Sequence, residues 1–174
     1  MEQIDFKKYI ELYNLEDYIF NVVGSKIKER GYMLFEDFYK IAMWKSVRQK
    51  QKYLQNKDSI ESVSKEAFGL NNEAEKIEKL CSLSGVGIPT ASAILTIVYP
   101  TNYGVIDVRC IEMLQMLKYP IKKTITKNNW LKYLEIIRGI AKENHITPRE
   151  VDKALFAMHR EILDGQDYRN LYVT

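Results

Sequence analysis

The sequence predicts an all-α protein on three observations. Apolar residues recur at spacings of three and four along most of the chain, which is the period of one buried helix face. Helix-start signatures, in which a capping residue is followed by Glu three positions later, occur at several points. No stretch alternates apolar and polar residues long enough to predict a sheet. We therefore expect about eight to ten short helices.

The N-terminal part is predicted to be helical in three segments. Apolar residues keep the helical spacing over 6–13, over 18–27 and over 34–44. Each segment is long enough to present one apolar stripe to a core. With 46% hydrophobic residues, the chain has the apolar surface that such a core requires.

Capping signals place the next helices. Asp58 with Glu61, and Asn72 with Glu75, resemble capping boxes in which Asp or Asn replaces the usual Ser or Thr. The residues that follow the second box, 74–83, read as one helix with an apolar face.

A glycine turn at 84–87 separates this helix from a second one. Gly85 and Gly87 permit positive φ and remove Cβ atoms that would keep a ligand away. Pro89 occupies an early position of the second helix, and the small residues after it allow close packing of the two helices. Amides around the glycines, at the N-terminus of that helix, are expected to bind a nucleic-acid phosphate.

The C-terminal part is predicted to hold two long helices. Asn129 is expected to cap a helix whose apolar face runs over 130–140. Thr147 and Glu150 enclose Pro148 in a full capping box, which starts the last helix. That helix is expected to end near Gly165.

Charge is distributed unevenly along the chain. The net charge of +3 is too small to identify a nucleic-acid partner. Segments 38–57 and 113–134, however, carry six and five basic residues and no acidic residue. They form one polyanion-binding face if they converge in space, and separate solvated surfaces if they do not. The sequence leaves both possibilities open.

Cysteine usage and hydropathy indicate a cytoplasmic protein without a membrane partner. Cys81 and Cys110 are too few for a disulfide framework or a four-cysteine cluster. Residues 1–5 lack the basic and then apolar order of a signal sequence. The apolar run 88–99 is too short to span a bilayer.

A single acidic residue ends the longest uncharged stretch. The 27 residues of 80–106 carry no charged side chain, and Asp107 follows them directly. A carboxylate at this distance from a phosphate-binding turn suits a reactive site beside a nucleic-acid backbone. Asp107 could equally be only the N-cap of a helix over 108–118, which is worth about 1 kcal/mol.

Two motifs resemble the helix-hairpin-helix DNA glycosylase superfamily, which includes endonuclease III and 8-oxoguanine DNA glycosylase. The run LSGVGIPTASAIL (83–95) is similar to its hairpin, L-P-G-V-G, followed by two residues that are often Arg-Lys and then by T-A. VIDVR (105–109) is similar to its V-D-x-H-V segment, whose Asp is catalytic. The spacing agrees, since Pro89 takes the place of the hairpin lysine eighteen residues before Asp107. The close match covers 80–113.

The resemblance implies a two-lobed helical fold formed by residues 1–174 as one domain, with the hairpin motif at about 74–99. It implies double-stranded DNA with a damaged or modified base as partner, and Asp107 as the group that assists attack of water. Because Pro89 replaces the lysine that bifunctional members use, it implies a monofunctional N-glycosylase or an inactive relative. The chain has too few cysteines for the iron–sulfur cluster of some relatives, and no cofactor is expected to be required.

Further site residues follow from the resemblance and from the basic and aromatic residues near the motifs. The expected DNA contacts are Gly85, Val86, Gly87, Thr90, Lys45, Arg48 and Arg109. A flipped base must stack on aromatic side chains, and the candidates for its pocket are Tyr39, Trp44 and Tyr99. A monovalent cation, Na⁺ or K⁺, is expected on the main-chain carbonyls of Cys81, Leu83 and Val86.

Two other functions remain open at this point. A helix-hairpin-helix module that binds DNA without chemistry would keep the turn and make no use of the charge of Asp107. A helical protein-interaction domain would use Gly85 and Gly87 only to let helices pack closely. Trp44, one helical turn after Ile41, would then be a core residue.

Overall fold

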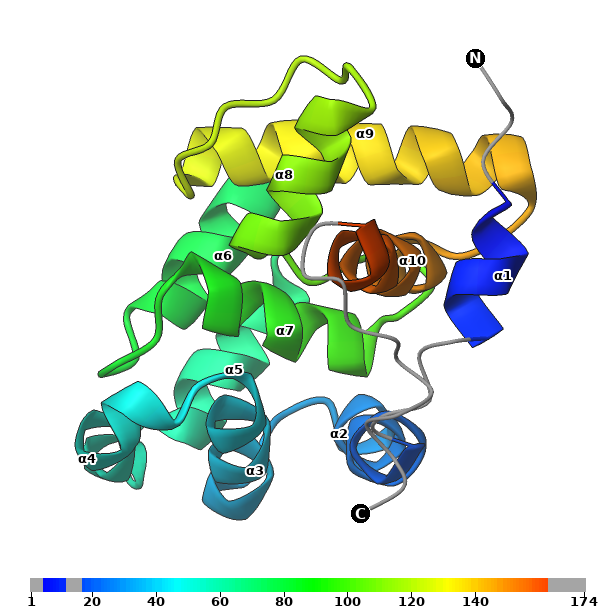
Figure 1. Ribbon diagram of the computed structural model, residues 1–174. Helices are drawn as coiled ribbons and strands as arrows, with labels where there is room; N and C mark the ends of the chain where they lie inside the picture. Colours follow the sequence, from blue (N-terminus) through cyan, green and yellow to red (C-terminus); the bar gives the residue numbers. More distant parts are fainter. Residues whose placement is uncertain (1–4, 12–16, 163–174) are drawn as a thin grey trace.

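The computed structural model describes residues 5–11 and 17–162 (Figure 1). Within these ranges no β-strand is present, which confirms the all-α prediction. None of the helices described there combines the length and the apolar character that crossing a membrane requires. In chain order the elements are α1 (Phe6–Glu11), the π-helix η1 (Ile19–Gly24), α2 (Ser25–Arg30), α3 (Phe35–Lys45), the 3₁₀ turn η2 (Val47–Gln49), α4 (Lys50–Tyr53), the 3₁₀ turn η3 (Leu54–Asn56), α5 (Ile60–Gly69), α6 (Glu73–Cys81), α7 (Ile88–Val98), α8 (Val108–Met116), α9 (Lys127–Asn144) and α10 (Pro148–Ile162).

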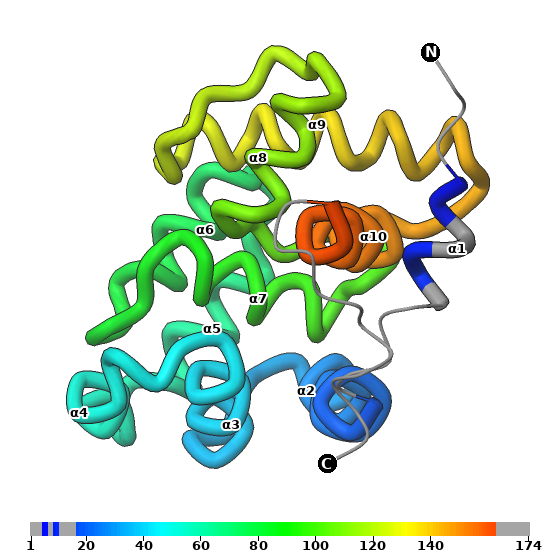
Figure 2. Tube along the Cα trace, in the orientation of Figure 1, coloured from blue at the N-terminus to red at the C-terminus, as the bar shows by residue number. Residues whose placement is uncertain are grey.

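Helix α7 is the centre of the arrangement. Every residue from Thr90 to Val98 is buried, as expected for a helix that is apolar on all sides. Figures 1 and 2 show α2 to α5 on one side of α7, and α8, α9 and α10 on the other. The segment before α7 and the segment after it therefore lie at the boundary between these two groups of helices.

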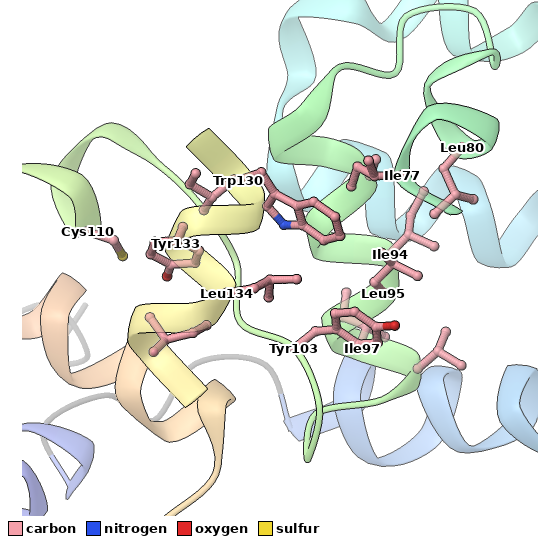
Figure 3. Packing of buried hydrophobic residues seen from close by; sticks show 14 of the residues in the cluster. Ile77, Leu80, Ile94, Leu95, Ile97, Tyr103, Cys110, Trp130, Tyr133 and Leu134 are labelled. Atoms are coloured by element: carbon pink, nitrogen blue, oxygen red, sulfur yellow. The ribbon is translucent and has the colours of Figure 1, made fainter. Parts of the chain in front are cut away.

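One cluster of buried apolar side chains connects the two groups. Figure 3 shows Trp130 and Leu134 of α9 directed toward Ile77 of α6 and Ile94 of α7. Tyr103, in the segment after α7, stacks on Trp130 with ring centroids 6.4 Å apart. Each of these large side chains contributes about 1.5–3 kcal/mol by burial.

The predicted capping box at Thr147 is confirmed, and so is Asn72 as an N-cap. The side chain of Asn72 accepts hydrogen bonds from the amides of Ala74 and Glu75 at 2.9 and 3.2 Å. At the start of α10, the Thr147 hydroxyl accepts from the amide of Glu150 at 3.2 Å, and the Glu150 carboxylate accepts from the amide of Thr147 at 2.7 Å. Both signals are local in sequence, so the tertiary structure did not need to be known.

The predicted cap at Asn129 is wrong. Helix α9 begins at Lys127, three residues earlier than predicted, because Thr126 is the N-cap and accepts from the amide of Asn129 at 3.2 Å. The amide group of the Asn129 side chain is buried and donates instead to the carbonyls of Lys122 and Thr124, at 2.6 and 2.7 Å. Asn129 thus closes the loop before α9.

The predicted box at Asp58 is also wrong. Helix α5 begins at Ile60, and Ser59 before it makes no capping bond through its side chain. Residues 12–13 of the first predicted helix, and the predicted end of the last helix near Gly165, lie outside the described residues.

Candidate functional site

The turn between α6 and α7 presents an open helix N-terminus. Gly85 adopts φ +79°, in the left-handed region that favours glycine. Gly87 precedes α7 in an extended conformation, and no side chain caps the helix. In the first helical turn the amides of Ile88 and Thr90 have no acceptor within the helix, and Pro89 has no amide hydrogen. The turn therefore directs donors and the positive end of a helix dipole outward.

A buried asparagine holds this turn in place. Asn56, 2% exposed, accepts a hydrogen bond from the amide of Ser84 at 2.7 Å and donates to the Ser84 carbonyl at 2.9 Å. The Ser84 hydroxyl also donates to the side-chain oxygen of Gln55 at 2.8 Å. Asn56 is not predicted from the sequence, because 28 residues separate it from Ser84 and no local pattern connects them.

The two glycines of the turn have different roles. A Cβ on Gly85 would lie 2.9 Å from Cβ of Lys52 and 3.1 Å from Cδ1 of Tyr53, so Gly85 lets α4 pack on the turn. Gly87 is exposed, and a Cβ there would come only within 3.8 Å of the Pro89 ring. A ligand can therefore approach the turn at Gly87, whereas Gly85 is needed for the packing of α4 against the turn.

We expect Asn56→Ala to destabilise the protein by about 1–3 kcal/mol, because it leaves the amide and carbonyl of Ser84 without their buried partner. Urea unfolding followed by circular dichroism measures the difference. The control is Gln55→Ala, which removes an exposed contact to the same serine and should change stability by less than about 0.5 kcal/mol. Equal effects of the two variants would contradict the role given to Asn56.

A groove of about 670 Å³ joins the turn to the start of α8. It lies between the turn, the C-terminal end of α3 with η2, and the first residues of α8. The predicted site residues that line it are Trp44, Lys45, Arg48, Gly85, Gly87, Thr90 and Asp107. The structure therefore brings most of the predicted phosphate contacts and the predicted catalytic carboxylate to one groove.

A smaller cavity of about 240 Å³ continues inward from this groove. Trp44, Lys45 and Asp107 line both spaces, and Arg149, Asp152 and other residues of α8 and α10 line the inner one alone. Its volume is slightly below the range of about 300–1,000 Å³ for small-molecule pockets. It suits a single ring or sugar, and the outer groove suits a chain.

Asp107 faces this boundary and also caps α8. Its Oδ1 accepts from the amide of Cys110 at 3.0 Å, so the predicted N-cap is confirmed. Its Oδ2 lies 3.6 Å from Nζ of Lys45, and the side chain is 23% exposed. One oxygen of Asp107 therefore positions the helix while the other lies beside a cation at the two cavities.

Buried groups from three helices hold the segment that carries Asp107. The amide of Val105 donates to Oδ2 of Asp152 at 2.6 Å, and the amide of Ile106 donates to the hydroxyl of Ser92 at 3.2 Å. Tyr133 donates its hydroxyl to the Val105 carbonyl at 2.9 Å. Burial raises the pKa of the Tyr133 phenol well above its usual value, so it stays a donor.

The inner end of the small cavity contains a buried ion pair. Arg149 and Asp152 pair through Nη1 and Oδ1, and both side chains are buried. The Arg149 guanidinium also lies over the ring of Phe20, 4.4 Å from its centroid. Burial, together with Asp107 and Asp152, raises the pKa of the neighbouring Cys110 thiol well above its usual value, so this cysteine is neutral and not a nucleophile.

Only one of the three predicted pocket aromatics lies at the site. Trp44 lines both cavities and meets Phe20 edge to face, with ring centroids 6.0 Å apart. Tyr39 and Tyr99 line neither space: Tyr39 packs on another ring of α3 at 5.7 Å, and Tyr99 on a ring of α5 at 5.8 Å. The structure does not place these two tyrosines in the predicted pocket.

Arg109 and Val86 also lie away from the open groove. The Arg109 guanidinium lies over the ring of Phe156, 5.2 Å from its centroid, and Phe156 lines the inner cavity. Val86 is buried, and its amide donates to the Leu83 carbonyl at 3.1 Å. Neither residue lines the groove beside Gly87.

The carbonyls predicted to hold Na⁺ or K⁺ belong to one tight turn. Cys81 ends α6, and the Leu83 carbonyl already accepts from the amide of Val86. In the described part of the chain no three His, Cys, Asp or Glu side chains form a metal-binding group. The monovalent cation therefore stays a prediction that depends on main-chain oxygens alone.

The first basic segment lines the groove, and the second contributes one apolar residue to it. Arg48, from the first segment, is exposed at its edge, and Ile125, from the second, lines the opposite side. In the second segment, Lys123 and Lys127 ion-pair with acidic side chains of α8 and α6. None of the five lysines of the second segment lines the groove, so the two segments do not place their basic side chains together there.

Comparison of the chain with protein-family models, with curated proteins and with solved structures finds no match.

Proposed function

We propose that this protein is a DNA N-glycosylase, which releases a modified or mismatched base from double-stranded DNA by attack of water. The single observation that carries the proposal is the placement of Asp107. It lies in the groove that contains the open helix N-terminus at Gly87, and it also lines the inner cavity. A phosphate held by the turn would therefore place the sugar next to a carboxylate.

In the proposed mechanism the groove binds the DNA backbone and the inner cavity receives the base. The amides of Ile88 and Thr90 bind a backbone phosphate without reading sequence, and Arg48 adds positive charge at the groove edge. The target nucleotide leaves the base stack, because its glycosidic bond is inaccessible inside a duplex. Its base enters toward the inner cavity, where the indole of Trp44 offers a stacking surface.

Asp107 supplies the chemistry. Cleavage of the glycosidic bond builds positive charge on the deoxyribose as the base departs, and a nearby carboxylate stabilises that charge. Its oxygen beside Lys45 can also orient water or accept its proton. The other oxygen is fixed by the amide of Cys110, so the carboxylate is held in one orientation before the substrate arrives.

The test is incubation of the protein with duplexes that each contain one oxidised, alkylated, deaminated or mismatched base. Hot alkali then cleaves the strand wherever a base has been lost. We expect an alkali-sensitive site in at least one duplex and its disappearance with Asp107→Asn. Base release that does not depend on Asp107, or release from none of the substrates, contradicts the proposal.

A DNA-binding module without chemistry is the second candidate. It is favoured by the engagement of both Asp107 oxygens within the protein, one by the helix amide and the other beside Lys45. It predicts salt-sensitive DNA binding that Asp107→Asn leaves intact, with no base release. Measuring binding and base release on the same duplexes separates the two functions.

A further inference from the structure

A guanidinium is held in place in the inner cavity. Arg149 lines this cavity and not the outer groove, and 8% of its side chain is exposed. The guanidinium lies over the ring of Phe20 at 4.4 Å, and Asp152 accepts from its Nη1. The main-chain amide of Arg149 donates to the Pro100 carbonyl at 3.3 Å, which ties the start of α10 to the segment after α7. The cation therefore has its position before any ligand enters.

We infer that Arg149 binds the departing base and stabilises the negative charge that the base carries as it leaves, which makes uracil-type pyrimidines the substrate class. Such a base is a single neutral ring with two carbonyl oxygens, and it leaves the sugar as an anion. The inference deepens the proposed function and rests on it. N-alkylated bases such as 7-methylguanine are cationic and leave as neutral molecules, so they gain nothing from a fixed cation and are not substrates.

The charge of Arg149 is only partly balanced by its partner. Asp152 divides its carboxylate between the guanidinium and the amide of Val105, which donates to the other oxygen at 2.6 Å. An arginine keeps its proton at every working pH. Arg149 therefore stabilises an anion by its charge and its N–H groups, and does not act by transferring a proton.

The rest of the cavity strengthens this effect. At its mouth the charges of Lys45 and Asp107 lie 3.6 Å apart and oppose each other. The remaining lining is uncharged, and consists of Trp44, Val105, Phe156 and the thiol of Cys110, whose raised pKa keeps it neutral. In surroundings of this kind a guanidinium stabilises a neighbouring anion far more than it does in water.

The cavity then acts on both charges that one bond cleavage creates. The C1′–N1 bond breaks with both electrons passing to the base, whose negative charge spreads to the carbonyl oxygens beside Arg149. The oxygen of water bonds to C1′, and one proton of that water goes to Asp107. The base takes up a proton once it has left the cavity, and Asp107 releases its own, so the site returns to its starting state.

The test compares single-turnover release of uracil and of 5-fluorouracil from otherwise identical duplexes. The two bases have nearly the same shape, but fluorine stabilises the anion, so 5-fluorouracil needs less help to leave. Arg149→Gln keeps a donor for Asp152 and removes the charge. We expect it to slow uracil release at least about 100-fold and 5-fluorouracil release by a clearly smaller factor.

Two further variants separate charge from structure. Arg149→Lys keeps the positive charge and should keep the ratio of the two rates close to that of the wild type. The matched control is Arg48→Gln, the same substitution at the groove edge, which weakens phosphate binding and should slow both bases by the same factor. Equal slowing of both bases by Arg149→Gln would leave Arg149 with a structural role and overturns the inference.

The wild type supplies a measurement that does not depend on the folding of any variant. It should release uracil, and should release 7-methylguanine no faster than this base is lost spontaneously. Failure to release uracil, or faster loss of 7-methylguanine, overturns the inference, and the proposed function stands as long as any base is released. Release of no base from any duplex overturns both.

Discussion

Asp107→Asn is expected to lower the rate of base release by about 10²–10⁴-fold while leaving the fold intact. Asparagine is as good an N-cap as aspartate, so its oxygen can still accept from the amide of Cys110 and hold the start of α8. What it removes is the negative charge beside the proposed cationic transition state. The variant therefore separates the capping role of this residue from its electrostatic role.

The measurement is a single-turnover rate on the duplex that the wild type processes fastest, together with thermal unfolding of each variant. The matched control is Asp58→Asn, an exposed acidic residue that lines neither the groove nor the inner cavity. We expect this control to release base at the wild-type rate. A normal rate with Asp107→Asn would leave the carboxylate with the capping role alone.

The helices could be predicted from sequence because their signals are local. The caps at Asn72 and Thr147 use partners within three residues, so composition and spacing were sufficient. The prediction of Asn129 as the cap of α9 is wrong because Thr126, also a good capping residue, lies three residues before it and takes that position. The buried bonds of Asn129 to the preceding loop decide between the two, and the sequence pattern does not contain them.

Most of the groove could also be predicted, because the turn and Asp107 lie close together in the sequence. The position of Tyr99 away from the groove has a simple geometric cause. Tyr99 lies beyond the far end of α7, and the 11 residues of that helix extend about 16 Å away from the turn. Trp44, near the end of α3, reaches the site because α3 packs on α7.

The groups that hold the site were missed because their contacts depend on topology. Asn56 reaches Ser84 across 28 residues, and Asp152 reaches Val105 across 47. The sequence placed residue 152 within the last helix, and nothing in the helical pattern indicated that its carboxylate would support the Asp107 segment. Residues that position a site in this way can be found only when the packing of the helices is known.

Asp152→Ala is expected to cause the largest loss of stability, about 3–5 kcal/mol, because it leaves the buried guanidinium of Arg149 without this carboxylate. The amide of Val105 also loses its acceptor at 2.6 Å. For a chain of this size, each kilocalorie lowers the melting temperature by about 2–4 °C. We therefore expect a decrease of about 10 °C, measured by calorimetry or circular dichroism.

A double variant distinguishes the cost of the lost ion pair from that of the lost acceptor. Arg149→Met combined with Asp152→Leu removes both charges of the buried pair, and should be more stable than Asp152→Ala, which removes only one of them. Asp152→Asn keeps an acceptor for Val105 and should fall between Asp152→Ala and the wild type. If instead Asp152→Ala unfolds at the wild-type temperature, the bonds from Ser92 and Tyr133 suffice to hold the segment that carries Asp107.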